Sequence, residues 1–121
     1  MTIHIPVLGL ALLLAPAAAW ADDATSAGKK VYGDNCVLCH SPTGAPSAPM
    51  KKLGVADLSL AKWQASRTDE QIRKIVSDGK PDTLMRAFRD ELSEEDIEAV
   101  VKYVRTLARP EAPSDAAPKK K

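Results

Sequence analysis

Both cysteines of this 121-residue chain lie within one five-residue stretch, Cys36-Val37-Leu38-Cys39-His40. Two thiols three positions apart are about one turn apart on a helix, so both can bond to one edge of the same flat molecule. The imidazole of His40 follows the second thiol directly and can swing under the centre of that molecule. A small chain that holds a large group in this way must fold around it.

The C-x-x-C-H spacing is that of covalent c-type haem attachment. In this interpretation Cys36 and Cys39 form thioether bonds to the haem vinyl groups. His40 is then the proximal iron ligand through a neutral imidazole nitrogen, and a carbonyl normally holds its other N–H. The sequence therefore predicts one covalently bound haem c. A large apolar group would also supply what the protein lacks, because only 4% of its residues are aromatic.

Three other uses of two cysteines and a histidine compete with haem attachment. A structural zinc site needs four Cys or His ligands, and the other histidine, His4, lies in a segment that we expect to be removed. A thioredoxin-like redox pair typically lies beside a βαβ pattern, which is not visible here. A structural disulfide would close only a small loop and would leave His40 unexplained.

The N-terminal segment has the pattern of a cleaved signal peptide. Residues 1–21 contain no Lys, Arg, Asp or Glu, and they end in Ala19-Trp20-Ala21, an A-x-A cleavage pattern. The apolar run from Ile5 to Ala15 is too short to span a membrane. We therefore expect export to the periplasm, cleavage after residue 21, and no stable membrane insertion; an uncleaved anchor is the alternative.

The mature chain is expected to hold one domain over residues 22–110. After it, residues 111–121 (EAPSDAAPKKK) have the composition of a disordered tail. The formal net charge of the chain is only +1, so it lacks the basic excess typical of nucleic-acid binding.

Three helical patterns, and no pattern of alternating strands, predict an all-α fold. The first helix is expected from about Thr25 to Cys36. The second begins with Thr68 as N-cap in a capping box and stops at Gly79. The third begins after Ser93 and runs to Pro110, and its apolar face is made by Ile97, Val100, Val101, Val104 and Leu107.

Long connections separate the predicted helices. Residues 41–56 form a Pro- and Gly-containing loop, residues 57–66 are an ambiguous short helix or turn, and residues 81–92 form a second loop. Loops of this length in a small domain usually have a function or wrap around something.

Together these segments resemble the class I c-type cytochromes, which are small monohaem electron carriers. The resemblance rests on GKKVYGDNCVLCH, DLSLAKWQ and MRAFRDELSEEDIEAVVKYVRTL, and covers about residues 25–108. It implies a small cytochrome c-like fold, with three main helices and long loops wrapped around the haem. It also implies a close crossing of the terminal helices at Gly28, with Tyr32 and Tyr103 nearby. The chain departs from the family where Arg86, rather than proline, follows Met85.

Met50 and Met85 are the candidates for the second axial ligand, because a thioether is a known ligand of haem c. Met50 follows His40 closely, so its loop would have to turn tightly round the haem edge. Met85 lies between the second and third helices, with enough chain to form a distal wall. We therefore predict axial ligation by His40 and Met85. The resemblance further implies that Trp63 packs on, or hydrogen-bonds to, a haem propionate; an ordinary core role is the alternative.

Two protein ligands leave no iron position for a substrate, so the sequence predicts outer-sphere electron transfer and no catalytic residue. The competing hypothesis is a haem peroxidase or gas-reactive haem protein. It would require a distal acid or base, and no histidine except His40 lies outside the expected signal peptide.

We expect a monomer that exchanges single electrons transiently with larger redox proteins, donors and acceptors alike. Four lysines either frame the exposed haem edge for an acidic partner or are simply solvated: Lys51, Lys52, Lys62 and Lys80. A permanent subunit of a dehydrogenase or oxidase complex is the alternative.

Overall fold

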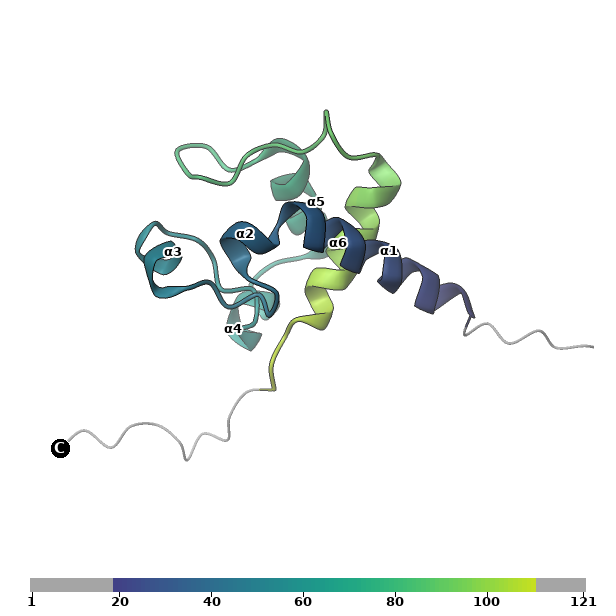
Figure 1. Ribbon diagram of the computed structural model, residues 1–121, viewed down its shortest axis with the longest axis horizontal. Helices are drawn as coiled ribbons and strands as arrows, with labels where there is room; N and C mark the ends of the chain where they lie inside the picture. The colour runs from purple at the N-terminus through teal and green to yellow at the C-terminus, as the bar shows by residue number, and fades with distance from the viewer. Residues whose placement is uncertain (1–18, 111–121) are drawn as a thin grey trace, which may run out of the picture.

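The computed structural model describes the backbone of residues 19–110 and the side chains of residues 25–110. Most of the predicted signal peptide, and all of the predicted tail at 111–121, lie outside these residues. The described part of the chain is helical and contains no strand, which confirms the all-α prediction (Figure 1). None of its helices combines the length and the apolar character that crossing a bilayer requires.

Six helices follow one another along the described residues. The three longest correspond to the three predicted helices, and the three short ones lie in the stretch between the first and second of these. Their bounds are α1 Ala19–Asn35, α2 Val37–His40, α3 Ala48–Lys52, α4 Ala61–Ala65, α5 Asp69–Asp78 and α6 Glu94–Thr106.

The first and last helices cross closely, as Figure 1 shows for α1 and α6. Gly28 permits this crossing, because a Cβ atom there would lie 2.1 Å from the carbonyl oxygen of Ala99 and 2.8 Å from the Cβ of Tyr103. The rings of Tyr32 and Tyr103 pack beside the crossing with their centroids 5.3 Å apart. Both expectations from the family resemblance are confirmed.

The core joins α1, α5, α6 and the connecting segments. The predicted apolar face of α6 is buried at Ile97, Val100, Val101 and Val104, and Leu107 is partly buried against the same core. Helix α5 contributes Ile72 and Val76. It begins with the predicted capping box, in which Thr68 accepts from Gln71 N and the Gln71 side chain accepts from Thr68 N, and it stops at Gly79.

Three boundaries differ from the sequence predictions. Helix α1 begins at Ala19 rather than near Thr25, in an alanine-containing segment that favours helix, and so runs through the expected cleavage position. Helix α3 lies within the predicted loop at 41–56, where Pro49 sets the backbone of its first turn. Helix α6 ends at Thr106 rather than at Pro110. Proline has no N–H to donate to the Thr106 carbonyl four residues earlier, and Arg109 N–H donates to Ser59 O at 2.8 Å instead of continuing the helix.

Arg105, in the last turn of α6, fixes the region around α4. Its guanidinium donates to the carbonyls of Gln64 and Arg67 and forms an ion pair with Asp69. The buried Gln64 amide donates to Leu58 O at 2.7 Å and to Val104 O at 2.9 Å. These bonds hold α4, and with it Trp63, against the end of α6.

Candidate haem site

The C-x-x-C-H segment forms a tight helical turn at the end of α1. Cys36 N–H still donates to Tyr32 O, while His40 N–H donates to Cys36 O at 2.9 Å and so begins the short helix α2. Ser41 ends α2 with a positive φ of 62°. The two thiols are therefore one turn apart, in the arrangement that the sequence predicted, and they are not joined to each other.

The His40 ring is held by one backbone carbonyl. Its Nδ1 lies 3.0 Å from Ala56 O, and because a carbonyl only accepts, Nδ1 carries the proton. Nε2 therefore keeps its lone pair. Burial lowers the pKa of His40, although the bond to Ala56 opposes this shift, so the neutral form is favoured. A neutral imidazole with a free nitrogen is the form that binds iron.

A cavity of about 630 Å³ opens beside this turn. Its size lies within the range of pockets that bind cofactors and other small molecules. All five residues singled out from the sequence line it: Cys36, Cys39, His40, Trp63 and Met85. Met50 does not, although Leu53, at the C-terminal end of the same short helix, does. In Figure 1 the segment between α5 and α6 (green) extends over the same side of the molecule as α2 and α3.

The segment that carries Met85 is folded back onto the end of α5. Lys80 N–H donates to Met85 O at 2.9 Å, and the Thr83 hydroxyl donates to Lys80 O while accepting from Met85 N–H. Gly79 has a φ of 72°, and a Cβ atom there would lie 2.8 Å from Met85 O. Hydrogen bonds with Lys80 and Thr83 thus fix the backbone of Met85, and Gly79 leaves room for its carbonyl.

The lining of the cavity fits a haem in two respects. Most lining residues are apolar, among them Val37, Leu58, Ile72, Val76, Phe88 and Val104. The Nε1–H of Trp63 is buried and has no hydrogen-bond partner within the described residues. Buried tryptophan N–H groups normally have an acceptor, so the site calls for an acceptor from a bound group, which a haem propionate can supply.

Basic side chains at this cavity differ from the set expected from the sequence. Of the four predicted lysines only Lys80 lines it; the others are Lys51, Lys52 and Lys62. Two arginines that were not among the predicted site residues do line it, Arg67 and Arg86. Arg67 stacks over the Trp63 ring at 4.8 Å, and Arg86 over the Phe88 ring at 4.3 Å. Arg86 stood out in the sequence only as a departure from the family pattern after Met85.

The competing uses of the two cysteines find no support in the site. Burial, followed by the influence of Cys39, raises the pKa of the Cys36 thiol to about 11. A redox-active pair needs a lowered thiol pKa instead. No group of three or more His, Cys, Asp or Glu side chains within the described residues is arranged to hold a metal ion by itself.

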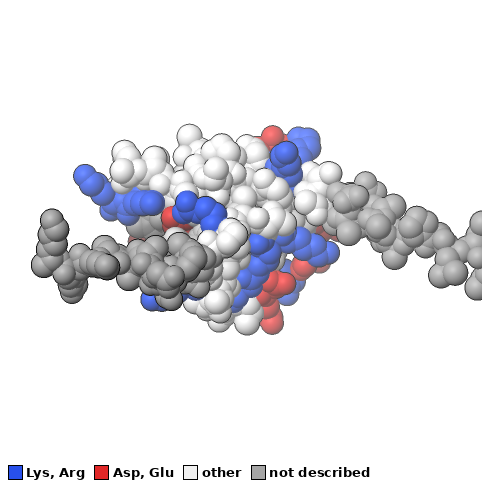
Figure 2. Space-filling model, turned by 90° about the horizontal axis from the view of Figure 1, so that it is seen from below, with Lys and Arg blue, Asp and Glu red and all other residues white. Residues whose placement is uncertain are grey.

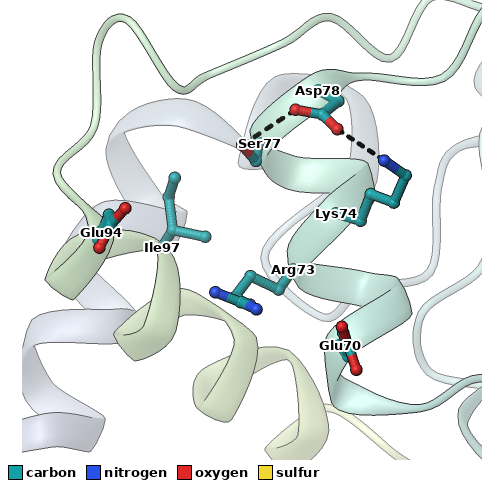
Figure 3. Close-up of a pocket in the computed structure, with 7 residues that line it drawn as sticks. All are labelled: Glu70, Arg73, Lys74, Ser77, Asp78, Glu94 and Ile97. Carbon is teal, nitrogen blue, oxygen red and sulfur yellow. Dashed lines mark hydrogen bonds and ion pairs between the residues drawn. The ribbon is translucent and has the colours of Figure 1, made fainter.

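A second, smaller hollow of about 300 Å³ lies between α5 and the start of α6 (Figure 3). Charged side chains of both signs surround it, and Lys74 and Ser77 both bond to Asp78 beside it. It contains none of the residues predicted to bind the cofactor: its lining is Glu70, Arg73, Lys74, Ser77, Asp78, Glu94 and Ile97.

Comparison with known proteins shows which family this chain belongs to. The family model described as "Cytochrome C oxidase, cbb3-type, subunit III" matches residues 23–104. Cytochrome c6 of Cladophora glomerata is 36% identical over 78 residues, which are 64% of this chain and 81% of that protein. The cbb3-type cytochrome c oxidase subunit CcoP of Azospirillum sp. (strain B510) is 30% identical over 82 residues, but the match spans only 27% of that longer protein.

Solved structures agree with the sequence relatives. The KustC0563 c-type cytochrome has a TM-score of 0.63 at 33% sequence identity, over 68% of this chain and 98% of that one. A cavity lined by both thiols of a C-x-x-C-H turn, inside an all-α fold shared with these relatives, leaves one assignment. The chain belongs to the cytochrome c family, within the group described by the cbb3-type subunit III model, and is a small class I c-type cytochrome with a covalently bound haem c.

Proposed function

We propose that this cytochrome is a periplasmic carrier of single electrons between larger redox proteins, with His40 and Met85 as its axial ligands. One observation carries the proposal: a single apolar cavity is lined by both thiols, by the His40 imidazole and by Met85. The haem supplies one-electron exchange between ferric and ferrous iron. Two protein ligands would leave no iron position for a substrate, so these residues would hold the haem for electron transfer without bond making.

Each side chain has a defined part in this proposal. Cys36 and Cys39 anchor the cofactor covalently at the end of α1. His40 offers Nε2 because Ala56 holds the proton on Nδ1. Met85 offers a thioether that needs no deprotonation, from a segment whose backbone is fixed by Lys80 and Thr83. Trp63 donates its N–H to a propionate, and the apolar lining keeps water from the iron.

Covalent attachment is tested by denaturing the purified protein and extracting it with acidified organic solvent. Haem should stay with the polypeptide, because unfolding does not break thioether bonds. Cys36→Ala combined with Cys39→Ala should release it. Haem that leaves the unaltered chain would refute the attachment at these two residues.

The carrier role is tested by electron-exchange kinetics with a redox partner captured from periplasm. Figure 2 shows basic side chains spread over the face in view with acidic ones among them, rather than one continuous basic patch. We therefore expect fast exchange through a small transient interface, below about 1,200 Å², with only a modest fall in rate as salt rises. Electron exchange that is slower than the partner's own turnover would argue against the carrier role.

A permanent subunit of an oxidase complex is the second candidate, because the family model and CcoP both carry oxidase names. Gel filtration of a native extract separates the two hypotheses. A carrier elutes at the size of a monomer, whereas a subunit elutes with the complex.

Intact mass of the same material tests export: a cleaved chain begins at Asp22, and a chain that retains residues 1–21 was not processed there.

A further inference from the structure

We propose that Asp57, Ser59 and Arg109 form a clamp that fixes the Ala56 carbonyl against the His40 ring, and that they thereby tune the haem as positioning residues. The inference rests on the proposed role of His40 as an axial ligand. It adds residues from outside the cavity, since none of the three lines it. We call these three residues the proximal clamp.

The clamp is a chain of hydrogen bonds centred on Ser59, which is completely buried. The Ser59 hydroxyl donates to a carboxylate oxygen of Asp57 and accepts from Arg109 Nε–H at 3.1 Å. The backbone of Ser59 takes part at both ends. Its N–H donates to the same Asp57 oxygen at 3.0 Å, and its carbonyl accepts from Arg109 N–H at 2.8 Å. Two bonds thus join Arg109 to Ser59, and two join Ser59 to Asp57.

Asp57 is the residue directly after Ala56, so its conformation sets the direction of the Ala56 carbonyl. The neighbouring Leu58 is held as well: its N–H donates to Gly44 O at 2.8 Å and its carbonyl accepts from Gln64. These bonds come from the loop after α2 and from α4. The clamp adds a third attachment, which comes from the residues after α6.

Charge gives the hydrogen bonds their direction. Burial alone would raise the pKa of Asp57, but hydrogen bonds from Ser59, then Lys51 and Arg109, outweigh it and lower the pKa. Asp57 is therefore a carboxylate near neutral pH and only accepts. The Ser59 hydroxyl must donate to it, which leaves the hydroxyl oxygen free to accept from Arg109. Lys51 Nζ lies 3.7 Å from the other carboxylate oxygen.

The clamp protects the hydrogen bond from His40 Nδ1–H to Ala56 O, and this bond affects the reduction potential. A hydrogen bond donated by the outer nitrogen of a ligating imidazole makes the other nitrogen more basic. A more basic imidazole favours ferric over ferrous iron and so lowers the reduction potential. Loosening the Ala56 carbonyl should therefore raise the potential, even though the three clamp residues lie outside the cavity.

Ser59→Ala is the sharpest test, because it removes the central hydroxyl without changing any charge. We expect a higher reduction potential and exchange of the His40 Nδ1–H with solvent about tenfold faster, the factor that corresponds to about 1.4 kcal/mol. The near-infrared iron–sulfur band should persist, since Met85 is untouched. Ser77→Ala is the matched control: it also removes a hydroxyl that donates to an aspartate, Asp78, but in α5, and it should change neither quantity.

Arg109→Ala separates the clamp from simple electrostatics. Loss of a nearby positive charge by itself lowers the reduction potential, whereas loss of the clamp raises it. A rise therefore supports the clamp, and a fall contradicts it. Truncation after Pro110 keeps Arg109 and should leave the potential unchanged.

Two further results would overturn the inference, and they can be told apart. If Ser59→Ala lowers the thermal midpoint but leaves the potential and the Nδ1–H exchange as they were, the three residues only stabilise the fold. If the unaltered protein shows no histidine ligation of its iron, the proposed function fails, and the clamp fails with it. Should Ser59→Ala not fold, Arg109→Ala decides by the sign of its shift.

Discussion

Gly28 of α1 lies so close to Ala99 of α6 that a Cβ atom on the glycine would be 2.1 Å from the alanine carbonyl oxygen. This contact sets the crossing of the two terminal helices. The crossing in turn places the end of α1, and therefore Cys36, against the core, which includes Val100 and Val104 of α6.

Gly28→Ala should destabilise the protein by about 1–3 kcal/mol or more, because the two backbones must move apart. Gly33→Ala is the control in the same helix, since a Cβ atom there meets nothing within 4 Å. It should be neutral or stabilise by up to about 1 kcal/mol, because alanine favours helix. Urea unfolding of both variants measures the difference. Equal effects would show that Gly28 acts through helix propensity and not through the crossing.

Gly79→Ala should disturb the Met85 segment specifically. Gly79 combines a φ of 72° with a ψ of −177°, a region that only glycine occupies readily, and a Cβ atom there would contact Met85 O and Ala87 N at 2.8 Å. We expect a loss of about 2–4 kcal/mol and a weakened iron–sulfur band.

Gly54→Ala separates backbone strain from steric contact. Gly54 has a similar φ of 84°, but a Cβ atom there meets nothing within 4 Å. Its substitution should cost about 1–2 kcal/mol and leave the iron–sulfur band unchanged. If Gly54→Ala also weakens the band, general destabilisation explains both variants, and Gly79 has no special relation to Met85.

The sequence predicts best what local signals determine. Helix α5 and the start of α6 depend on Thr68, Gln71 and Ser93, whose side chains bond within their own first turns. The C-x-x-C-H turn is equally local, so its three residues were found without the fold. The crossing at Gly28 depends on a distant partner, and it was expected only because the chain resembles a known family.

The sequence predicts poorly what distant contacts determine. Helix α3 is five residues long and has little stability of its own, so residues 41–56 contain no sequence pattern that predicts it. Gln64 is buried because Leu58 and Val104, which are far apart in the chain, accept both hydrogens of its amide. Arg67 reaches the cavity by stacking on Trp63. Arg109 lies beyond the end of α6, where its backbone N–H donates to Ser59 O. No periodicity in the sequence marks these partners.

Asp57→Asn should remove one acid-dependent part of the stability. The folded protein holds the pKa of Asp57 below its ordinary value, so the carboxylate stabilises the fold at pH values above that ordinary value, near 4. This contribution is lost as the pH falls through the lowered pKa. At pH 7 the unaltered protein should be more stable than the variant by about 1 kcal/mol, and the gap should be smaller at pH 3, below the ordinary pKa of about 4. Urea unfolding at both pH values measures it.

Asp78 and Glu91 also have lowered pKa values, from hydrogen bonds with Lys74 and Arg86. Acid therefore lowers the stability of the unaltered protein and of the Asp57→Asn variant. These groups are present in the two chains alike, and their effect cancels in the difference. A gap that stays constant from pH 7 to pH 3 would mean that the charge of Asp57 contributes nothing, and that the variant loses packing instead.

Met85→Ala should open the sixth position of the iron, erase the near-infrared iron–sulfur band and lower the potential by on the order of 0.1 V, within the roughly 0.8 V range that axial ligands set. Small external ligands should then bind the iron. Met50→Ala is the matched control. Met50 lies on α3 and does not line the cavity, so its loss should leave the band, the potential and ligand binding almost unchanged.

The two methionine variants together decide the ligand, because each removes one thioether and little else. Met85 lines the cavity, and its backbone is fixed by Lys80 and Thr83. A neighbouring side chain of the same segment therefore cannot easily take the place of the lost thioether. If Met50→Ala erases the band and Met85→Ala does not, the assignment is reversed, and α3 must move toward the cavity when haem is bound. If neither erases it, another group or a water holds the sixth position, and a peroxidase or gas-binding function gains support at the expense of the electron carrier.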